Sequence, residues 1–150
     1  MQIRSRALAL LLVPVMLFAA ACSSDSSKPA SPTLSNAPYV ATSITGATQV
    51  PGSTIELTFG ADGSLSVNAG CNVMNSTYTL AGDVLKVTAM TSTKKACDPA
   101  LMAQDYWVGE LLTSSPTVAP AGANGIVITG KSGSMTLQDS KTASTNTSTS

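Results

Sequence analysis

Thr54-Ile55-Glu56-Leu57-Thr58-Phe59 and Ser64-Leu65-Ser66-Val67-Asn68 alternate apolar and polar side chains in two short runs. A period of two is the pattern of a β-strand with one buried face, so the apolar residues of each run should point inward together. Ala61-Asp62-Gly63 lies between the runs and supplies the residue types that tight turns prefer. The stretch therefore predicts a β-hairpin.

The same strand–turn–strand pattern occurs twice more along the chain. Residues 76–80 and 84–87 flank a Gly-Asp turn, and residues 125–129 and 134–137 flank a Gly-Lys-Ser-Gly turn. A weaker strand is predicted over residues 39–44. Charged residues make up only 11% and aromatic residues only 4% of the 150 residues, while Ser, Thr, Ala, Gly and Val are abundant. This composition favours strands and turns over helices.

One segment departs from the alternation. Asp98-Pro99 predicts a helix start, with the Asp98 side chain as the N-cap acceptor and Pro99 at the first helical position. Up to Leu112, Leu101 and Val108 fall on one face at helical spacing. The predicted fold class is α+β and mostly β: an antiparallel meander or partial barrel with one helix inserted before the last hairpin.

The N-terminal residues have the pattern of an export signal. Arg4 and Arg6 precede an uncharged apolar run over residues 7–21, which ends in three alanines before Cys22. Small residues directly before a cysteine resemble a lipobox, where the signal is removed after lipid is attached to the thiol. We predict a lipoprotein signal peptide over residues 1–21 and lipidation of Cys22. The alternative is an ordinary signal peptide cut after Ala21.

This prediction divides the chain into four parts. Residues 22–38 are rich in Ser, Pro and Ala and predict a flexible tether behind the lipidated cysteine. Residues 39–138 hold the predicted folded domain, and residues 139–150 predict a disordered Ser/Thr tail. The expected location is the cell membrane or the outer membrane, with the domain facing outside the cytoplasm and the membrane contacted through the lipid anchor.

Charge and residue types disfavour several classes of function. Without Arg4 and Arg6, six lysines remain against eight acidic residues, a net charge of about −2. A weakly acidic domain without arginine is a poor phosphate binder, so nucleic acid is not an expected partner. Histidine is absent, which removes the commonest general base and metal ligand. We predict no catalytic residues, no metal site and no cofactor.

Two cysteines remain once Cys22 is assigned to lipid. Outside the cytoplasm, Cys71 and Cys97 are expected to form a disulfide, and metal or redox chemistry is the weaker alternative. The loop from residue 71 through residue 97 contains 27 residues, for which chain entropy predicts a stabilisation of roughly 3.5 kcal/mol.

A few side chains are candidates for surface or ligand contacts. Asn72 follows the first cysteine of the pair, although an asparagine in a turn more often bonds to the local backbone. Lys94 and Lys95 could form a small cationic spot beside the helix start, or they are ordinary solvated lysines. Trp107, next to Tyr106, either edges the core or contributes to an exposed aromatic patch for a partner.

Three stretches together resemble a known domain family. They are Phe59 to Asn72 with its Gly-Cys-Asn end, Tyr78 to Leu85, and Met90 to Met102, which contains Met-Thr-Ser-Thr-Lys-Lys-Ala-Cys. In this order and separation they resemble the META domain of bacterial heat-inducible and envelope lipoproteins. The resemblance implies a small β-rich domain with one helix, often membrane-anchored, and without an established enzymatic activity.

Two functions follow as hypotheses. The first is a non-enzymatic, membrane-anchored envelope lipoprotein whose domain is a binding or stress-tolerance module for an envelope protein or a small ligand. The second is a carrier that holds a small apolar or lipid ligand inside the partial barrel. The carrier predicts a concave apolar pocket of several hundred Å³, whereas a filled interior argues against it.

Overall fold

The computed structural model describes residues 32–34, 36 and 38–143. The predicted signal peptide, Cys22 and most of the predicted tether lie outside the described residues, as does the tail from residue 144. Among the described helices, none has the length and apolar character needed to cross a membrane.

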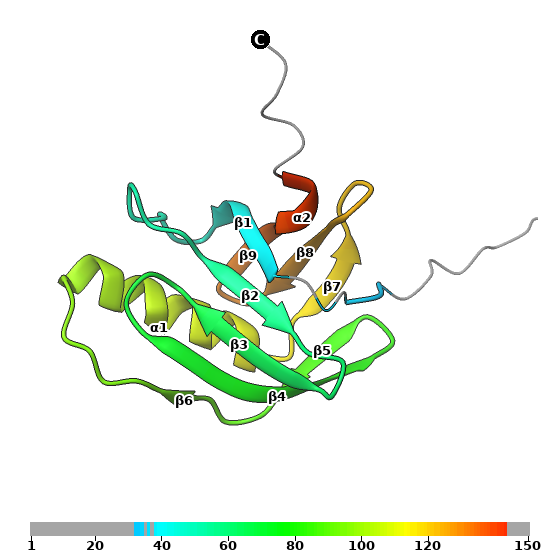
Figure 1. The fold of residues 1–150 in the computed structure, drawn as a ribbon, viewed down its shortest axis with the longest axis horizontal. Helices are drawn as coiled ribbons and strands as arrows, with labels where there is room; N and C mark the ends of the chain where they lie inside the picture. Colours follow the sequence, from blue (N-terminus) through cyan, green and yellow to red (C-terminus); the bar gives the residue numbers. More distant parts are fainter. Residues whose placement is uncertain (1–31, 35, 37, 144–150) are drawn as a thin grey trace, which may run out of the picture.

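The strands form a closed eight-stranded antiparallel barrel with one extra strand (Figure 1). The barrel contains β1 (Pro38–Thr45), β2 (Glu56–Phe59), β3 (Ser64–Asn68), β4 (Val73–Ala81), β5 (Val84–Val87), β7 (Thr117–Pro120), β8 (Gly125–Gly130) and β9 (Gly133–Asp139). Strand β1 pairs with both β2 and β9, and β3 pairs with β4, which closes the circle. The extra strand, β6 (Thr91–Ser92), pairs with β4 alone. The predicted α+β, mostly β class is confirmed.

The three predicted hairpins are present as β2–β3, β4–β5 and β8–β9. In the first, the Gly60 amide donates to the Ser64 carbonyl at 2.8 Å, and Gly63 takes a φ of 82° that favours glycine. The Asp62 carboxylate accepts from the Ser64 amide at 3.0 Å and from its hydroxyl at 2.6 Å. These two bonds lower the pKa of Asp62 below its ordinary value of 3.8. The turn is therefore fixed by its own side chains.

Large apolar side chains fill the barrel. Phe59 lies at the centre of an aromatic group, with its ring centroid 6.0 Å from that of Tyr39 and 5.0 Å from that of Tyr78, both edge to face. The largest side chains that are almost completely buried are Phe59, Ile55, Leu57, Leu65, Leu85, Leu111, Leu112, Ile128, Met135, Leu137, Val67 and Val108. Apolar burial on this scale is the main stabilising contribution of the fold.

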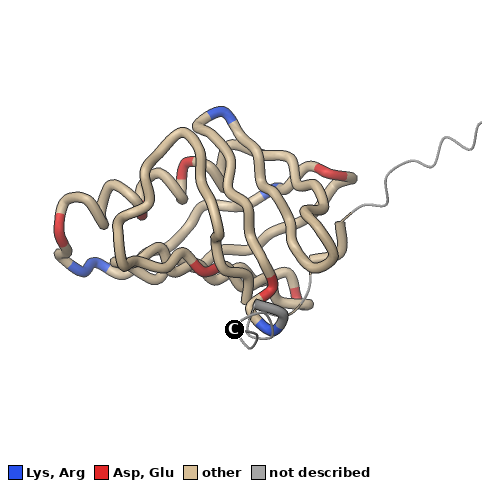
Figure 2. The backbone as a smooth tube through the Cα atoms, turned by 90° about the horizontal axis from the view of Figure 1, so that it is seen from above, with Lys and Arg blue, Asp and Glu red and all other residues tan. Residues whose placement is uncertain are grey.

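Charged residues are spread thinly along the described chain (Figure 2). One adjacent pair of basic residues lies at one end, where Lys94 and Lys95 are both exposed. Charge therefore plays little part in holding the barrel together.

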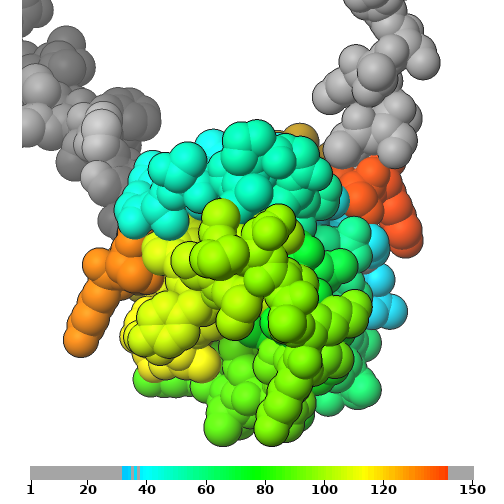
Figure 3. All heavy atoms as spheres, turned by 90° about the vertical axis from the view of Figure 1, so that its left-hand side faces the viewer, coloured from blue at the N-terminus to red at the C-terminus, as the bar shows by residue number. Residues whose placement is uncertain are grey.

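Helix α1 (Pro99–Thr113) follows β6 and precedes β7 in the chain, and it lies against the barrel. Figure 3 looks onto the N-terminal end of this helix and the segment that leads into it. Its inward face buries Val108, Leu111 and Leu112, as the spacing predicts, and Leu101 is half-buried. Pro99 begins the helix, but the Asp98 side chain makes no capping hydrogen bond. The prediction of Asp98 as the N-cap acceptor is therefore wrong, although the helix boundary is right.

Strand β7 is not among the strands predicted from the sequence, which indicated one helix before the last hairpin. Residues 117–120 instead pair with β8 through four residues and complete the barrel beside β5. On the β5 side, the Leu85 amide donates to the Pro116 carbonyl at 2.8 Å and the Val118 amide to the Asp83 carbonyl at 2.7 Å. The sheet is thus closed, not partial.

Strands β1 and β9 lie at the two ends of the described barrel. Strand β1 begins at Pro38, one residue before the predicted start. At the other end, Asp139 belongs to β9 and Ser140–Ala143 form the short helix α2, so the first residues of the predicted tail are part of the described structure.

Candidate functional site

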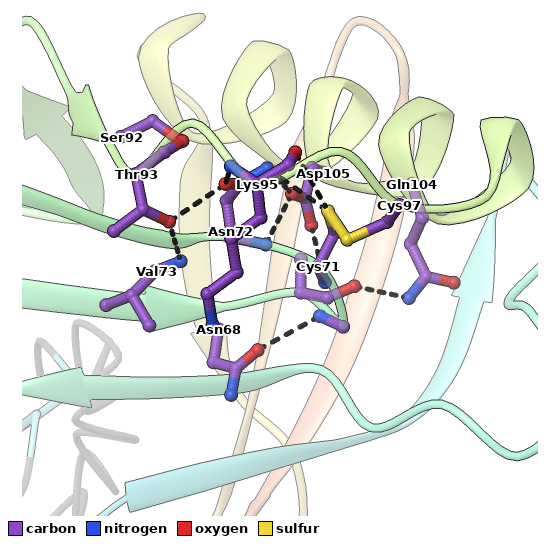
Figure 4. Close-up of a disulfide and its surroundings, with 12 residues drawn as sticks. Asn68, Cys71, Asn72, Val73, Ser92, Thr93, Lys95, Cys97, Gln104 and Asp105 are labelled. Atoms are coloured by element: carbon purple, nitrogen blue, oxygen red, sulfur yellow. Dashed lines mark hydrogen bonds between the residues drawn. A yellow bond between two sulfur atoms is a disulfide. The ribbon is translucent and has the colours of Figure 1, made fainter.

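The most elaborate polar arrangement lies where α1 meets the end of the β3–β4 hairpin (Figure 4). Cys71 and Cys97 form a disulfide there, with their Cα atoms 5.9 Å apart. The bridge joins the turn before β4 to the residue that precedes Asp98 and the helix. It confirms the predicted pairing of the two cysteines.

Asp105 extends from the buried face of α1 into this turn. Its Oδ2 atom accepts from the Asn72 amide at 2.8 Å and from the Asn72 Nδ2 at 3.0 Å. Its Oδ1 atom accepts from the Cys71 amide at 3.4 Å. The carboxylate thus satisfies two backbone donors of the turn, and such charge-assisted bonds are stronger than neutral ones.

Asn72 connects the same turn to the segment that leads into the helix. Its Oδ1 atom accepts from the Thr93 hydroxyl at 2.8 Å and from the Lys95 amide at 2.9 Å. Its Nδ2 atom also lies 3.3 Å from the Cys71 sulfur. Both polar atoms of the side chain are therefore hydrogen-bonded within the protein, to neighbouring side chains and to one backbone amide, which is a structural role.

Gln104, the residue before Asp105, joins the helix to the same turn and to a second loop. Its Nε2 atom donates to the Ala69 carbonyl at 2.6 Å and to the Ser53 hydroxyl at 3.0 Å. Its Oε1 atom accepts from the Val50 amide at 2.7 Å. Gln104 and Asp105 are therefore buried polar residues that attach α1 to two loops of the barrel, and the sequence analysis missed both.

A shallow groove of about 280 Å³ runs along α1 on the side of β4 and β6. Met74 and Met90 contribute apolar surface, and Tyr106 and Glu110 line the helix side. At Gly109 an added Cβ would lie 3.9 Å from the Met74 sulfur, an ordinary van der Waals distance, so the helix and β4 leave room for an alanine there. Methionine-lined surfaces adapt to partners of different shapes.

Trp107 and Tyr106, the two aromatic residues of α1, differ in burial. The Trp107 ring is half-buried against the core, and its Nε1 donates to the Ser132 carbonyl at 3.2 Å. Tyr106 is 71% exposed, and Met102, four residues before it, is 49% exposed. Trp107 therefore edges the core, while Tyr106 and Met102 form the exposed apolar face of α1.

The lysine pair lies beside the disulfide in the segment before the helix, and both side chains face solvent. Lys95 enters the polar arrangement only through its backbone amide, which donates to Asn72. Asn72 itself lines the wall of the groove. Of the predicted contact residues, the structure brings Asn72 and Lys95 together and leaves Trp107 on another side of the helix.

The hydroxyl groups beside this arrangement are engaged in local hydrogen bonds. The Ser92 hydroxyl donates to the Thr93 carbonyl at 3.0 Å, and the Thr93 hydroxyl donates to Asn72. Neither is positioned against a base that would activate it. Among the described residues, no group of three or more Cys, Asp or Glu side chains could hold a metal ion.

Comparisons with known proteins give a family and a fold. The family model of the META domain matches residues 32–145. One solved NMR structure aligns with a TM-score of 0.59 and 22% identity, covering 70% of this chain and 90% of its own. An NMR structure of a protein from Burkholderia xenovorans aligns with a TM-score of 0.56 and 22% identity, covering 71% and 83%. At this identity the similarity concerns the fold alone, and no curated protein matches the chain.

Proposed function

Because the chain belongs to the META domain family, we propose that it is a non-enzymatic binding module, anchored by lipid on Cys22 to the outside of a cell membrane or outer membrane. In this role the domain binds an envelope protein or a small ligand, or supports stress tolerance through such binding. The anchor is proposed from the Ala-Ala-Ala-Cys sequence that ends an uncharged apolar run.

The observation that carries the binding role is the exposed face of α1 beside its groove. Exposed large apolar side chains that lie together commonly mark interaction sites. Tyr106 and Met102 are one helical turn apart on this face, and the groove next to them adds Met74 and Met90. A surface of this kind supports binding to a partner.

The hydrogen bonds of the buried polar residues support a non-enzymatic role. Asp105, Asn72 and Gln104 are hydrogen-bonded to backbone groups of the adjoining loops and to neighbouring side chains. A catalytic group needs free capacity toward a substrate and an activating neighbour. These three residues instead contribute to the placement of α1.

The carrier alternative receives less support. Nearly completely buried side chains such as Phe59, Leu57 and Leu137 occupy the barrel interior, where a carried ligand would have to lie. Cavities that hold ligands are concave and largely enclosed. The groove along α1 is shallow and lies outside the barrel, so it suits a partner's surface more than an enclosed lipid chain.

The anchor is tested by expressing the full chain and its Cys22→Ala variant in a bacterium fed labelled palmitate. We expect label on the wild type, which sediments with membranes, and no label on the variant. A Cys71→Ala, Cys97→Ala double variant is the matched control and should keep the label. An unlabelled wild-type chain would contradict the proposal.

The non-enzymatic role is tested by assaying the purified chain against broad panels of hydrolase and transferase substrates. We expect no turnover above that of a heat-denatured sample. Turnover that disappears when a single polar residue, such as Asp105, is replaced would refute the proposed role.

A further inference from the structure

The groove along α1 contains a buried carboxylate without a counter-ion. Asp105 is 7% exposed and lines the groove where α1 meets the turn before β4 (Figure 4). Its three hydrogen bonds come from uncharged N–H groups of Cys71 and Asn72. No basic side chain in the described part of the chain forms an ion pair with it. Buried carboxylates are usually paired with a positive charge, so Asp105 leaves a net negative charge at the groove wall.

Asp105 can also accept a further hydrogen bond. Its Oδ2 atom takes two short bonds from Asn72, at 2.8 and 3.0 Å. Its Oδ1 atom takes one long bond, from the Cys71 amide at 3.4 Å. A carboxylate oxygen has two lone pairs, so Oδ1 retains the capacity to bind a donor from outside the chain.

The other charged residue of the groove is acidic as well. Glu110 is exposed and lines the groove five residues further along α1. It lies in the last turn of the helix, where the dipole already disfavours negative charge and where no basic residue offsets it. Lys94 and Lys95, the basic residues closest to α1 in sequence, do not line the groove. The groove is therefore a region of negative potential along its helix side.

Apolar groups supply much of the remaining lining. Met74 and Met90 line the strand side and the Tyr106 ring lines the helix side. At Gly109, an added Cβ would have only the Met74 sulfur within 4 Å outside the helix itself, so the floor is open there. Methionine side chains adapt to an apolar arm, and the face of an aromatic ring attracts a cation.

We propose that this groove binds a small organic cation that carries a short apolar arm, of the class of protonated primary alkylamines. The ammonium group lies beside the carboxylates of Asp105 and Glu110, and the arm lies against Met74 and Met90. A volume of about 280 Å³ is at the small end of the range for ligand sites, so it fits a ligand of this size and not a full lipid chain. Anions are repelled by both carboxylates.

The inference rests on the proposed binding role and names the class of ligand that the groove takes. Its failure is distinguishable from a failure of the proposed function. Lipid on Cys22 and the lack of turnover are measured without any cation, so both results would stand if the groove rejected alkylamines.

The first test compares three probes with the same arm and different charge. The purified full chain, with isotope-labelled methionine methyl groups, is titrated with hexylammonium, hexanol and hexanoate while the methyl NMR signals are followed. We expect saturable shifts of Met74 and Met90 with hexylammonium, roughly fivefold weaker binding of hexanol and no binding of hexanoate. Met135, buried inside the barrel, is the internal control and should not shift. Equal binding of the three probes, or no saturable shift at either groove methionine, would overturn the proposal.

The second test removes the exposed carboxylate and leaves the junction intact. Glu110→Gln keeps the size of the side chain and removes its charge, so hexylammonium binding should weaken roughly fivefold while hexanol binding stays the same. Glu56→Gln removes an exposed charge from β2 and is the matched control, which should change neither. Hexylammonium binding that is equal in wild type and Glu110→Gln would overturn the proposal.

The third test fills the groove. Leucine favours a helix more than glycine does, and a Cβ has room at position 109, so Gly109→Leu should leave the melting temperature equal or higher. The rest of the leucine side chain would occupy the open floor, and the shifts of Met74 and Met90 with hexylammonium should be lost. A folded Gly109→Leu variant that binds hexylammonium as the wild type does would overturn the assignment of the site.

Discussion

The barrel interior and the junction beneath α1 are held together by different physical means. Inside the barrel, Phe59 and its neighbours exclude water and are stabilised by apolar burial. At the junction, Asp105, Asn72 and Gln104 are buried but polar, and a disulfide lies beside them. Burial gives the barrel its stability, while directional bonds set the position of the helix. Substitutions in the two regions should therefore have different effects on stability.

Replacing the central aromatic residue should have the largest effect. Phe59→Ala removes a fully buried ring and two edge-to-face contacts, so the free energy of unfolding should fall by about 4 kcal/mol. Urea denaturation followed by circular dichroism measures it. Tyr106→Ala is the matched control on the exposed face and should change stability by less than about 0.5 kcal/mol.

Removing the disulfide should have the second-largest effect on the free energy of unfolding, and it should destabilise the junction before the barrel. The Cys71→Ala, Cys97→Ala variant is expected to lose roughly 3.5 kcal/mol, less if the reduced chain keeps residual structure. Reducing agent should destabilise the wild type by a similar amount and leave the variant unchanged. Equal stability of the oxidised and reduced wild type would show that the bridge contributes little.

Asp105→Asn should lower the free energy of unfolding by about 2 kcal/mol. The substitution removes the charge and turns one acceptor toward the Asn72 amide group into a donor. Because the lost bonds join α1 to the turn before β4, amide protection in the helix should fall more than that in β2 and β3. Asp83→Asn, at an exposed turn, is the control and should have little effect on either region.

The smallest expected effect concerns pH and the β2–β3 turn. Since the pKa of Asp62 is lowered in the folded state, its contribution is complete above the ordinary value of 3.8 and is lost as pH falls through the lowered pKa. Wild type and Asp62→Asn should therefore differ in melting temperature at neutral pH and converge in strong acid. A difference that persists unchanged in acid would contradict this origin.

Local pattern was sufficient to predict the hairpins. Period-two runs such as Thr54 to Phe59, with turn residues after them, specify strands without reference to the rest of the chain. The closure of the sheet was not predictable in this way. Strand β7 follows Pro116 and ends at Pro120, and 29 residues separate it from its partner β5. Its pairing with β5 therefore depends on contacts that no local pattern shows.

The candidate site was predicted in part. The disulfide followed from the count of cysteines and the expected compartment. Gln104 and Asp105 were missed because polar residues on a helix usually face solvent, and their burial depends on the loops that they contact. The Asp98 cap failed because a suitable residue type at the right position does not guarantee the side-chain bond.

The division between barrel and junction is tested most directly by hydrogen exchange of the disulfide-free variant, resolved by residue under native conditions. The account predicts that amides of α1 and of residues 93–98 lose protection by about 100-fold or more, while amides of β2, β3 and β9 lose much less. A uniform loss of protection across helix and strands would contradict it, because helix and barrel would then unfold as one unit.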